Sequence, residues 1–230
     1  MPEATLLFSR FSFMDKSGNS IGRQMPDGFP ECVDLREIGG KQDVFTLEGE
    51  VLQGLLEENF IPHSTVICKT ESLRAAGGYC QELRRAQDYD LWVRLATSGA
   101  VFSFLDDVVC SYRYDPHPSF STTTLQLKCR IEVMKRVIDR KSSTPLSARK
   151  LAYNKIRGYY KLWGDHLLQR RRLEEARMKY RASTKYGIGM IQVLSWALTH
   201  LGPLGRRMII FLNSGNDVFS NGSRGYNARD

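Results

Sequence analysis

The sequence predicts an α/β protein in which a mixed sheet with flanking helices is followed by an α-helical C-terminal extension. Two observations support this prediction. In the first half, short runs of alternating or continuous apolar residues stand between helical segments that end at glycine, as strands and helices of one sheet layer do. In the second half, Lys and Arg recur at every third or fourth position, which is typical of solvated helix faces.

Charge divides the chain near residues 122–124. Residues 1–124 carry 11 Lys and Arg against 18 Asp and Glu, a net charge of −7, whereas residues 125–210 carry 20 against 5, a net charge of +15. We therefore expect an α/β domain over residues 1–124 and a basic helical extension over 125–187. Amphipathic or apolar helices are expected over 188–213, and a Gly/Ser/Asn-rich disordered tail over 214–230.

The first expected elements are strands. Alternation from Thr5 to Phe13 predicts one strand, and Ser17-Gly18-Asn19 predicts a turn into a return strand. Residues 64–68 are interpreted as a short buried strand. Residues 101–105 and 108–114 are interpreted as two further strands, with the acidic pair at 106–107 as a solvated turn between them.

Two short helices are expected between these strands. Thr70 is the expected N-cap of a helix that reaches Ala76 and ends at two glycines. A second helix of about ten residues opens near Asp88 and ends before Gly99, where a left-handed C-cap favours glycine. Further on, the basic half predicts helices over residues 125–140, 146–170 and 173–186.

Asp88 is the candidate catalytic residue. It stands at the mouth of the second helix, where unpaired backbone N–H groups and the helix dipole favour an ionised carboxylate. An ionised carboxylate can accept a proton as a general base. The alternative is that Asp88 only caps the helix, because aspartate is a preferred N-cap residue.

Four separate segments, in this order, resemble the inverting family 2 glycosyltransferases. Residues 59–64 (NFIPHS) resemble the family's loop before the central strand, and residues 75–79 (AAGGY) its GGF/GGY turn. Residues 87–92 (QDYDLW) resemble its ED-Y-D-L-W segment, and residues 112–113 (YR) its YR strand end. This chain departs from the family at Gln87, where the family has Glu, and at Asp115, where it often has a His that is displaced here to His117.

The resemblance implies a GT-A fold and transfer of a sugar from a nucleotide-sugar donor to an acceptor hydroxyl in cell-surface or secreted glycan synthesis. Asp88 stands in the position of the general base, and His63, Gln87, Trp92 and Arg113 are the residues expected to bind substrate. Two of these have an alternative role. Helix spacing favours core packing for Trp92 over a place in the acceptor cleft, and Arg113 fits a surface role at a strand end equally well.

The family's N-terminal nucleotide-binding and metal-binding half has no counterpart here. The chain opens on a strand that resembles the one following the metal motif, and it contains neither G-x-x-x-x-G-K-[ST] nor G-x-G-x-x-G. Residues 88–90 spell D-x-D, but they open a helix instead of ending a buried strand. We therefore expect a truncated, acceptor-side half that is inactive alone, and we leave open whether the chain is an enzyme. The complete family enzyme is expected to use Mg or Mn, and no metal ligand is identified in this sequence.

The alternative function is a non-catalytic basic module that docks on a membrane or on a partner enzyme. Apolar runs over residues 188–198 and 208–212 flank Arg206 and Arg207. Each is shorter than the roughly 20 residues that span a bilayer, so they fit an interfacial helix or a helix packed on the domain. No zinc spacing or RNA-binding signature accompanies the basic residues, so nucleic acid is not an expected partner.

The five cysteines show no C-x-x-C spacing and are odd in number, which is typical of a reducing compartment. The N-terminus shows no signal-peptide pattern, and the four histidines are scattered without ligand spacing. The expected location is cytoplasmic, at the inner face of the membrane if the apolar helices bind lipid.

Overall fold

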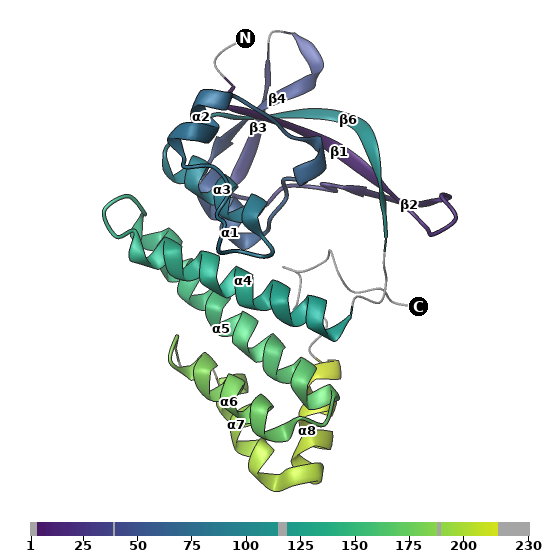
Figure 1. Cartoon of the computed structure of the whole chain (residues 1–230), viewed down its shortest axis with the longest axis vertical. Coiled ribbons are helices and arrows are strands. Elements are labelled where there is room, and N and C mark those ends of the chain that lie inside the picture. The colour runs from purple at the N-terminus through teal and green to yellow at the C-terminus, as the bar shows by residue number, and fades with distance from the viewer. Residues whose placement is uncertain (1–3, 39, 115–118, 188–189, 216–230) are drawn as a thin grey trace. The chain divides into compact units, whose positions relative to one another are not determined.

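A computed structural model describes residues 4–38, 40–114, 119–187 and 190–215 (Figure 1). The chain forms two compact units, one of Met1–His117 with Ser142–Ala148 and the other of Pro118–Lys141 with Arg149–Asp230. The departures from the family motif at Asp115 and His117 lie outside the described residues, as does the predicted tail from residue 216 onward.

The first unit is built on a curled mixed sheet, so the predicted α/β class with a mixed sheet and flanking helices is confirmed. Its described strands are β1 (Leu6–Met14), β2 (Ser20–Met25), β3 (Val33–Ile38), β4 (Lys41–Gly49), β5 (Ile67–Cys68) and β6 (Phe102–Arg113). They lie in the order β2-β1-β6-β4-β3, with β5 paired to β1 off this path. The β1–β6 pair is parallel and the other pairs are antiparallel.

The β1–β6 pair forms the centre of the sheet. Its register runs from Leu6 opposite Phe102 to Met14 opposite Arg113. Phe8 and Phe104 are fully buried, and their ring centroids lie 5.3 Å apart. Burial of these rings, together with the aliphatic side chains around them, is the main term that stabilises this unit.

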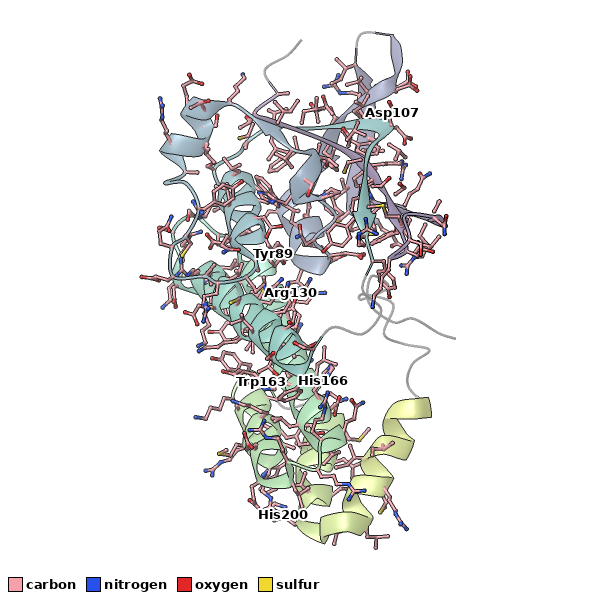
Figure 2. The ribbon with its side chains drawn as sticks, turned by 45° about the vertical axis from the view of Figure 1, so that its right-hand side comes forward. Tyr89, Asp107, Arg130, Trp163, His166 and His200 are labelled. Atoms are coloured by element: carbon pink, nitrogen blue, oxygen red, sulfur yellow. The ribbon has the colours of Figure 1, made fainter. Side chains whose placement is uncertain are left out.

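The helices of this unit are α1 (Val51–Glu57), a 3₁₀ turn η1 (His63–Thr65), α2 (Thr70–Ala75) and α3 (Gln87–Thr97). Figure 1 shows α1, α2 and α3 grouped beside the sheet. Leu91, Trp92 and Leu95 of α3 are buried in the sheet's core, as their helical spacing predicts. Tyr89, labelled in Figure 2, donates its hydroxyl to the Leu55 carbonyl of α1 at 2.9 Å, so α1 and α3 are joined by a buried hydrogen bond.

Two strand predictions were wrong. Residues 64–68 form η1 and a two-residue strand whose Ile67 is 70% exposed, not a buried strand. The reason is a local turn, in which Val66 N–H bonds the His63 carbonyl and Thr65 N–H bonds the Pro62 carbonyl. The predicted turn at 106–107 lies inside the single long strand β6, where Asp106 forms an ion pair with Arg10 of β1 and Asp107 is exposed (Figure 2).

The two predicted N-caps, Thr70 and the alternative role of Asp88, were also wrong. Lys69 is the N-cap of α2, and Thr70 is its first helical residue. The N-cap of α3 is Ala86, so Asp88 lies in the first turn and does not cap the helix. Sequence patterns also missed the β3–β4 hairpin and α1.

The second unit is helical. Its elements are α4 (Phe120–Asp139), α5 (Leu146–Gln169), α6 (Leu173–Thr184), α7 (Met190–Leu198), a 3₁₀ turn η2 (Thr199–Leu201) and α8 (Gly202–Gly215). The three basic helices were predicted in the right order, but α4 begins five residues before the expected start at 125. Ser119 explains this, because its hydroxyl accepts the Thr122 N–H at 3.2 Å and caps the helix.

The core of this unit lies where α5, α6, α7 and α8 meet. Its fully or nearly fully buried residues are Leu167, Leu168, Ala176, Tyr180, Leu198 and Ile209. Tyr180 donates its hydroxyl to Asp165 at 2.7 Å, and Lys161 pairs with the same carboxylate at 2.8 Å. Among the described residues, no helix has both the length and the apolar character that crossing a membrane requires.

Candidate functional site

The start of α3 sets the position of Asp88. Ala86, the N-cap, is buried and has left-handed backbone angles (φ 57°, ψ 27°), which are uncommon for a residue other than glycine. Asp88 follows in the first turn and is half-buried. Its carboxylate forms no hydrogen bond or ion pair within the part of the chain that the structure describes. Asp88 is therefore available to a ligand.

The neighbouring acid, Asp90, has a different environment. It is 1% exposed, and its Oδ2 lies 2.8 Å from the guanidinium of Arg94 on the next turn. Arg94 also donates to the carbonyls of Ala76 and Gly78, the latter at 2.6 Å. The Asp90–Arg94 pair therefore fixes the turn after α2 against α3, which a lone surface ion pair could not do.

Tyr79 is the side chain that this turn presents. Gly77 and Gly78 have φ of 82° and 65°, values that favour glycine, and they turn the chain so that Tyr79 follows directly. The Tyr79 hydroxyl lies 3.1 Å from Nε2 of His63. Burial, and then the negative charge of Asp88, raise the pKa of Tyr79. Tyr79 thus lies within the electrostatic reach of Asp88 while it hydrogen-bonds His63.

His63 is held in place through its neighbour Thr65. The Thr65 hydroxyl accepts the Ser9 N–H at 3.1 Å and lies 3.0 Å from the Ser9 carbonyl, which attaches η1 to β1. The exposed His63 ring packs edge-on against Tyr79, at 5.7 Å between centroids. The centroid of the His63 ring also lies 6.3 Å from that of the Trp92 ring.

Trp92 contributes to this site from the core. It is 1% exposed, so it does not line an open cleft. Its indole Nε1 is buried and has no hydrogen-bond partner among the described residues. Of the predicted site residues, His63 and Trp92 therefore lie close together, and Asp88 lies one helical turn before Trp92. Tyr79 bonds His63, and the charge of Asp88 acts on it.

Gln87 and Arg113 are the other two residues that were predicted to bind substrate. Gln87 is the first residue of α3, half-buried and directly before Asp88. Arg113 lies at the end of β6, where it donates to the carbonyls of Asp15 and Lys16 at 3.0 and 2.6 Å. It stabilises the β1–β2 turn, which is the surface role that the sequence left open as its alternative.

The described residues do not fit a divalent cation. No group of three or more His, Cys, Asp or Glu side chains is arranged around a common point in the part of the chain that the structure describes. Asp88 and Asp90 cannot bind one ion together, because side chains two residues apart on a helix point about 200° apart. Asp90 is also already paired with Arg94. The D-x-D sequence is therefore a feature of the helix start.

Two residues of the site were not among the predicted site residues. Tyr79 was visible as the last residue of the GGY match, and the signal that could have found it is the pair of glycines before it. Arg94 gave no sequence signal, because its role depends on carbonyls that are 16 and 18 residues away along the chain. No protein family, curated protein or solved structure matches this chain. A functional assignment therefore rests on the site itself.

Proposed function

We propose that the first unit is the acceptor-side half of an inverting, family 2-like glycosyltransferase with a GT-A-related fold. It would act on a nucleotide-sugar donor and on a glycan or lipid-linked acceptor in cell-surface or secreted glycan synthesis. The observation that carries the proposal is the unpartnered, half-buried carboxylate of Asp88 beside the hydrogen-bonded pair of Tyr79 and His63.

In this proposal Asp88 is the general base. The acceptor oxygen attacks the anomeric carbon of the donor sugar and forms the new C–O bond. The bond between that carbon and the phosphate oxygen breaks, and its electron pair leaves with the nucleoside diphosphate. The acceptor proton goes to Asp88. A positioned base of this kind contributes roughly 10²- to 10⁴-fold to the rate.

Tyr79 and His63 are proposed to position the acceptor. Both side chains are exposed and hydrogen-bonded to each other, and the charge of Asp88 raises the pKa of Tyr79. A sugar acceptor offers several hydroxyl groups, and a phenol and an imidazole can each donate or accept a hydrogen bond. Holding the attacking hydroxyl within reach of the base lowers the entropic cost of the reaction.

The supporting residues favour a rigid site. Arg94 and Asp90 fix the glycine turn, and Thr65 fixes η1, so neither Tyr79 nor His63 depends on a loose loop. The left-handed Ala86 is the kind of backbone outlier that clusters at functional sites. These features support the proposal without identifying the sugar.

The proposal covers the acceptor side only. Departure of a diphosphate needs positive charge, which in the family is a divalent cation such as Mg or Mn, and the described residues do not fit that ion. We place the reaction in the cytoplasm, at the inner face of the membrane. The five cysteines, which are all unpaired as disulfides, agree with a reducing compartment.

The test is Asp88→Asn in the complete enzyme, isolated from its own cells together with the donor-side half that it uses there. Sugar transfer would be measured with radiolabelled UDP-glucose, UDP-N-acetylglucosamine, UDP-galactose and GDP-mannose, each with a membrane extract as acceptor. The expected result is a loss of transfer of at least about 10²-fold with the melting temperature unchanged. Asp107→Asn is the matched control, because Asp107 is an exposed acid on β6, and it should keep full activity. Transfer that persists in Asp88→Asn would exclude Asp88 as the base.

A further inference from the structure

Several apolar side chains of α7 are exposed. Its buried residues include Ser195 and Leu198, whereas Met190, Val193, Leu194 and Trp196 are exposed. At 100° per residue these four lie on the half of the helix opposite Ser195. A surface helix that buried all of its apolar side chains would leave these four covered.

The next helix, α8, also exposes apolar residues. Leu204 and Met208 of α8 are 62% and 44% exposed, and their spacing of four residues places them on one side of the helix. Met190, Val193, Leu194, Trp196, Leu204 and Met208 are called the outer face below. Exposed apolar side chains that gather on a surface mark a binding site for a protein or a membrane.

Each of the two helices also has a buried side. Leu198 and Ile209 are buried in the core of the second unit, against α5 and α6. Arg177 of α6 donates to the carbonyl of Thr199 at 3.0 Å and so fixes the turn between the two helices. His200, labelled in Figure 2, marks this turn. The outer face therefore points away from the unit's own core.

The positive charge of this unit indicates which kind of partner fits the outer face. Arg207 of α8, which stands between Leu204 and Met208 in the sequence, is exposed, as are Arg181 of α6 and Lys185, the C-cap of that helix. Residues 125–210 as a whole carry a net charge of +15. A second copy of this chain would bring the same positive charge to the interface, whereas anionic lipid headgroups would compensate it.

We infer that the outer face of α7 and α8 is a docking surface for an anionic lipid bilayer. The apolar side chains enter the boundary between headgroups and acyl chains, with Trp196 at headgroup depth, and the Arg and Lys side chains bind lipid phosphates. Helices with a Trp-containing apolar face and a basic surround bind membranes in this way without crossing them. This inference concerns the second unit and does not depend on the proposed function of the first.

The test is co-sedimentation of the full chain with vesicles. The chain should bind vesicles of phosphatidylcholine with about one-third phosphatidylglycerol, and bind pure phosphatidylcholine much more weakly. The double variant Leu194→Asp/Leu204→Asp should lower the partition coefficient by more than about tenfold, because two apolar side chains no longer enter the bilayer. Adding salt should weaken wild-type binding, because it screens the lipid charge.

The matched control is Ile67→Asp, which places the same charge at an exposed apolar residue of the first unit and should leave vesicle binding unchanged. A second readout is the tryptophan emission, which should shift to the blue on vesicle addition, and less so in Trp196→Phe. The inference is overturned if the wild type does not bind anionic vesicles, or if the double variant binds as well as the wild type. A dimer that the double variant dissociates, without lipid binding, would assign the outer face to a second copy and would equally overturn it.

Discussion

Gly164 of α5 lies directly against the ring of Tyr180 of α6. A Cβ atom on Gly164 would lie 2.6 Å from Cε1 and 2.8 Å from Cδ1 of that ring. Tyr180 is fully buried and anchored by its hydrogen bond to Asp165, so the ring has no free direction in which to move. Glycine is required here for close helix packing.

We predict that Gly164→Ala destabilises the second unit by about 1–3 kcal/mol, because overpacking forces Tyr180 or α6 to shift. Gly158→Ala is the control in the same helix. Gly158 is exposed and has open space at its Cβ position, so alanine there should stabilise the helix by up to about 1 kcal/mol. Urea unfolding monitored by circular dichroism measures both values. Equal effects of the two substitutions would contradict this packing.

Replacing Arg94 should lower the free energy of unfolding. In Arg94→Ala, Asp90 remains buried without its ion-pair partner, and the carbonyls of Ala76 and Gly78 lose a donor. We expect a loss of about 3–5 kcal/mol in the free energy of unfolding. Arg74→Ala, at an exposed position on α2, should change it by less than about 0.5 kcal/mol. Chemical denaturation compares the two, and a small effect of Arg94→Ala would mean that the turn is held by other contacts.

The pKa of Tyr79 reports the placement of Asp88 without any activity assay. Burial and the charge of Asp88 raise this pKa above its ordinary value of 10.0. Asp88→Asn removes the charge but not the burial, so the pKa should fall part of the way back. NMR titration of the ring carbon in ¹³C-tyrosine-labelled protein measures it, with Asp107→Asn as the control. If the Tyr79 pKa were the same in Asp88→Asn as in the wild type, Asp88 would not lie close enough to Tyr79 to act on it.

His166 should make the second unit less stable in mild acid. Burial is the main cause that lowers the pKa of this imidazole, with smaller and opposed contributions from Asp165 and Arg170. The unfolded chain therefore binds the proton first, near pH 6.5, and stability is lost as the pH falls from there through the folded-state pKa. The melting temperature of the wild type should drop more between about pH 7.5 and pH 5 than that of His166→Gln. Parallel curves for the two proteins would rule out His166 as the cause.

Elements with strong local periodicity were predictable from the sequence. The core face of α3 and the order of α4, α5 and α6 follow from helical spacing, and β1 follows from alternation. The β3–β4 hairpin was missed because its strands carry charged residues, such as Arg36 and Glu48, which pair across the two strands only once these are aligned. The acidic pair in β6 resembled a turn because its partner, Arg10, is 96 residues away from Asp106.

The candidate site, like the fold, has parts that were predictable from local sequence and parts that were not. Asp88 and His63 were found because they lie in segments that resemble a known family, whereas Tyr79 became a site residue only through contacts across the fold. Ala86 could not have been predicted as left-handed, since alanine usually avoids that conformation and only the surrounding packing holds it there. Local patterns specify helices and strands, but contacts between distant segments specify the site.

The parallel pairing of β1 with β6 has a consequence for how this protein forms. Leu6 meets Phe102, and Met14 meets Arg113, so the centre of the sheet cannot close until β6 has been synthesised, long after β1. Until then Phe8 lacks its partner Phe104, although Phe29 and Phe60, which also pack against it, come earlier in the chain. Chains dominated by such distant pairings fold slowly. We therefore expect the first unit to fold more slowly than the helical second unit.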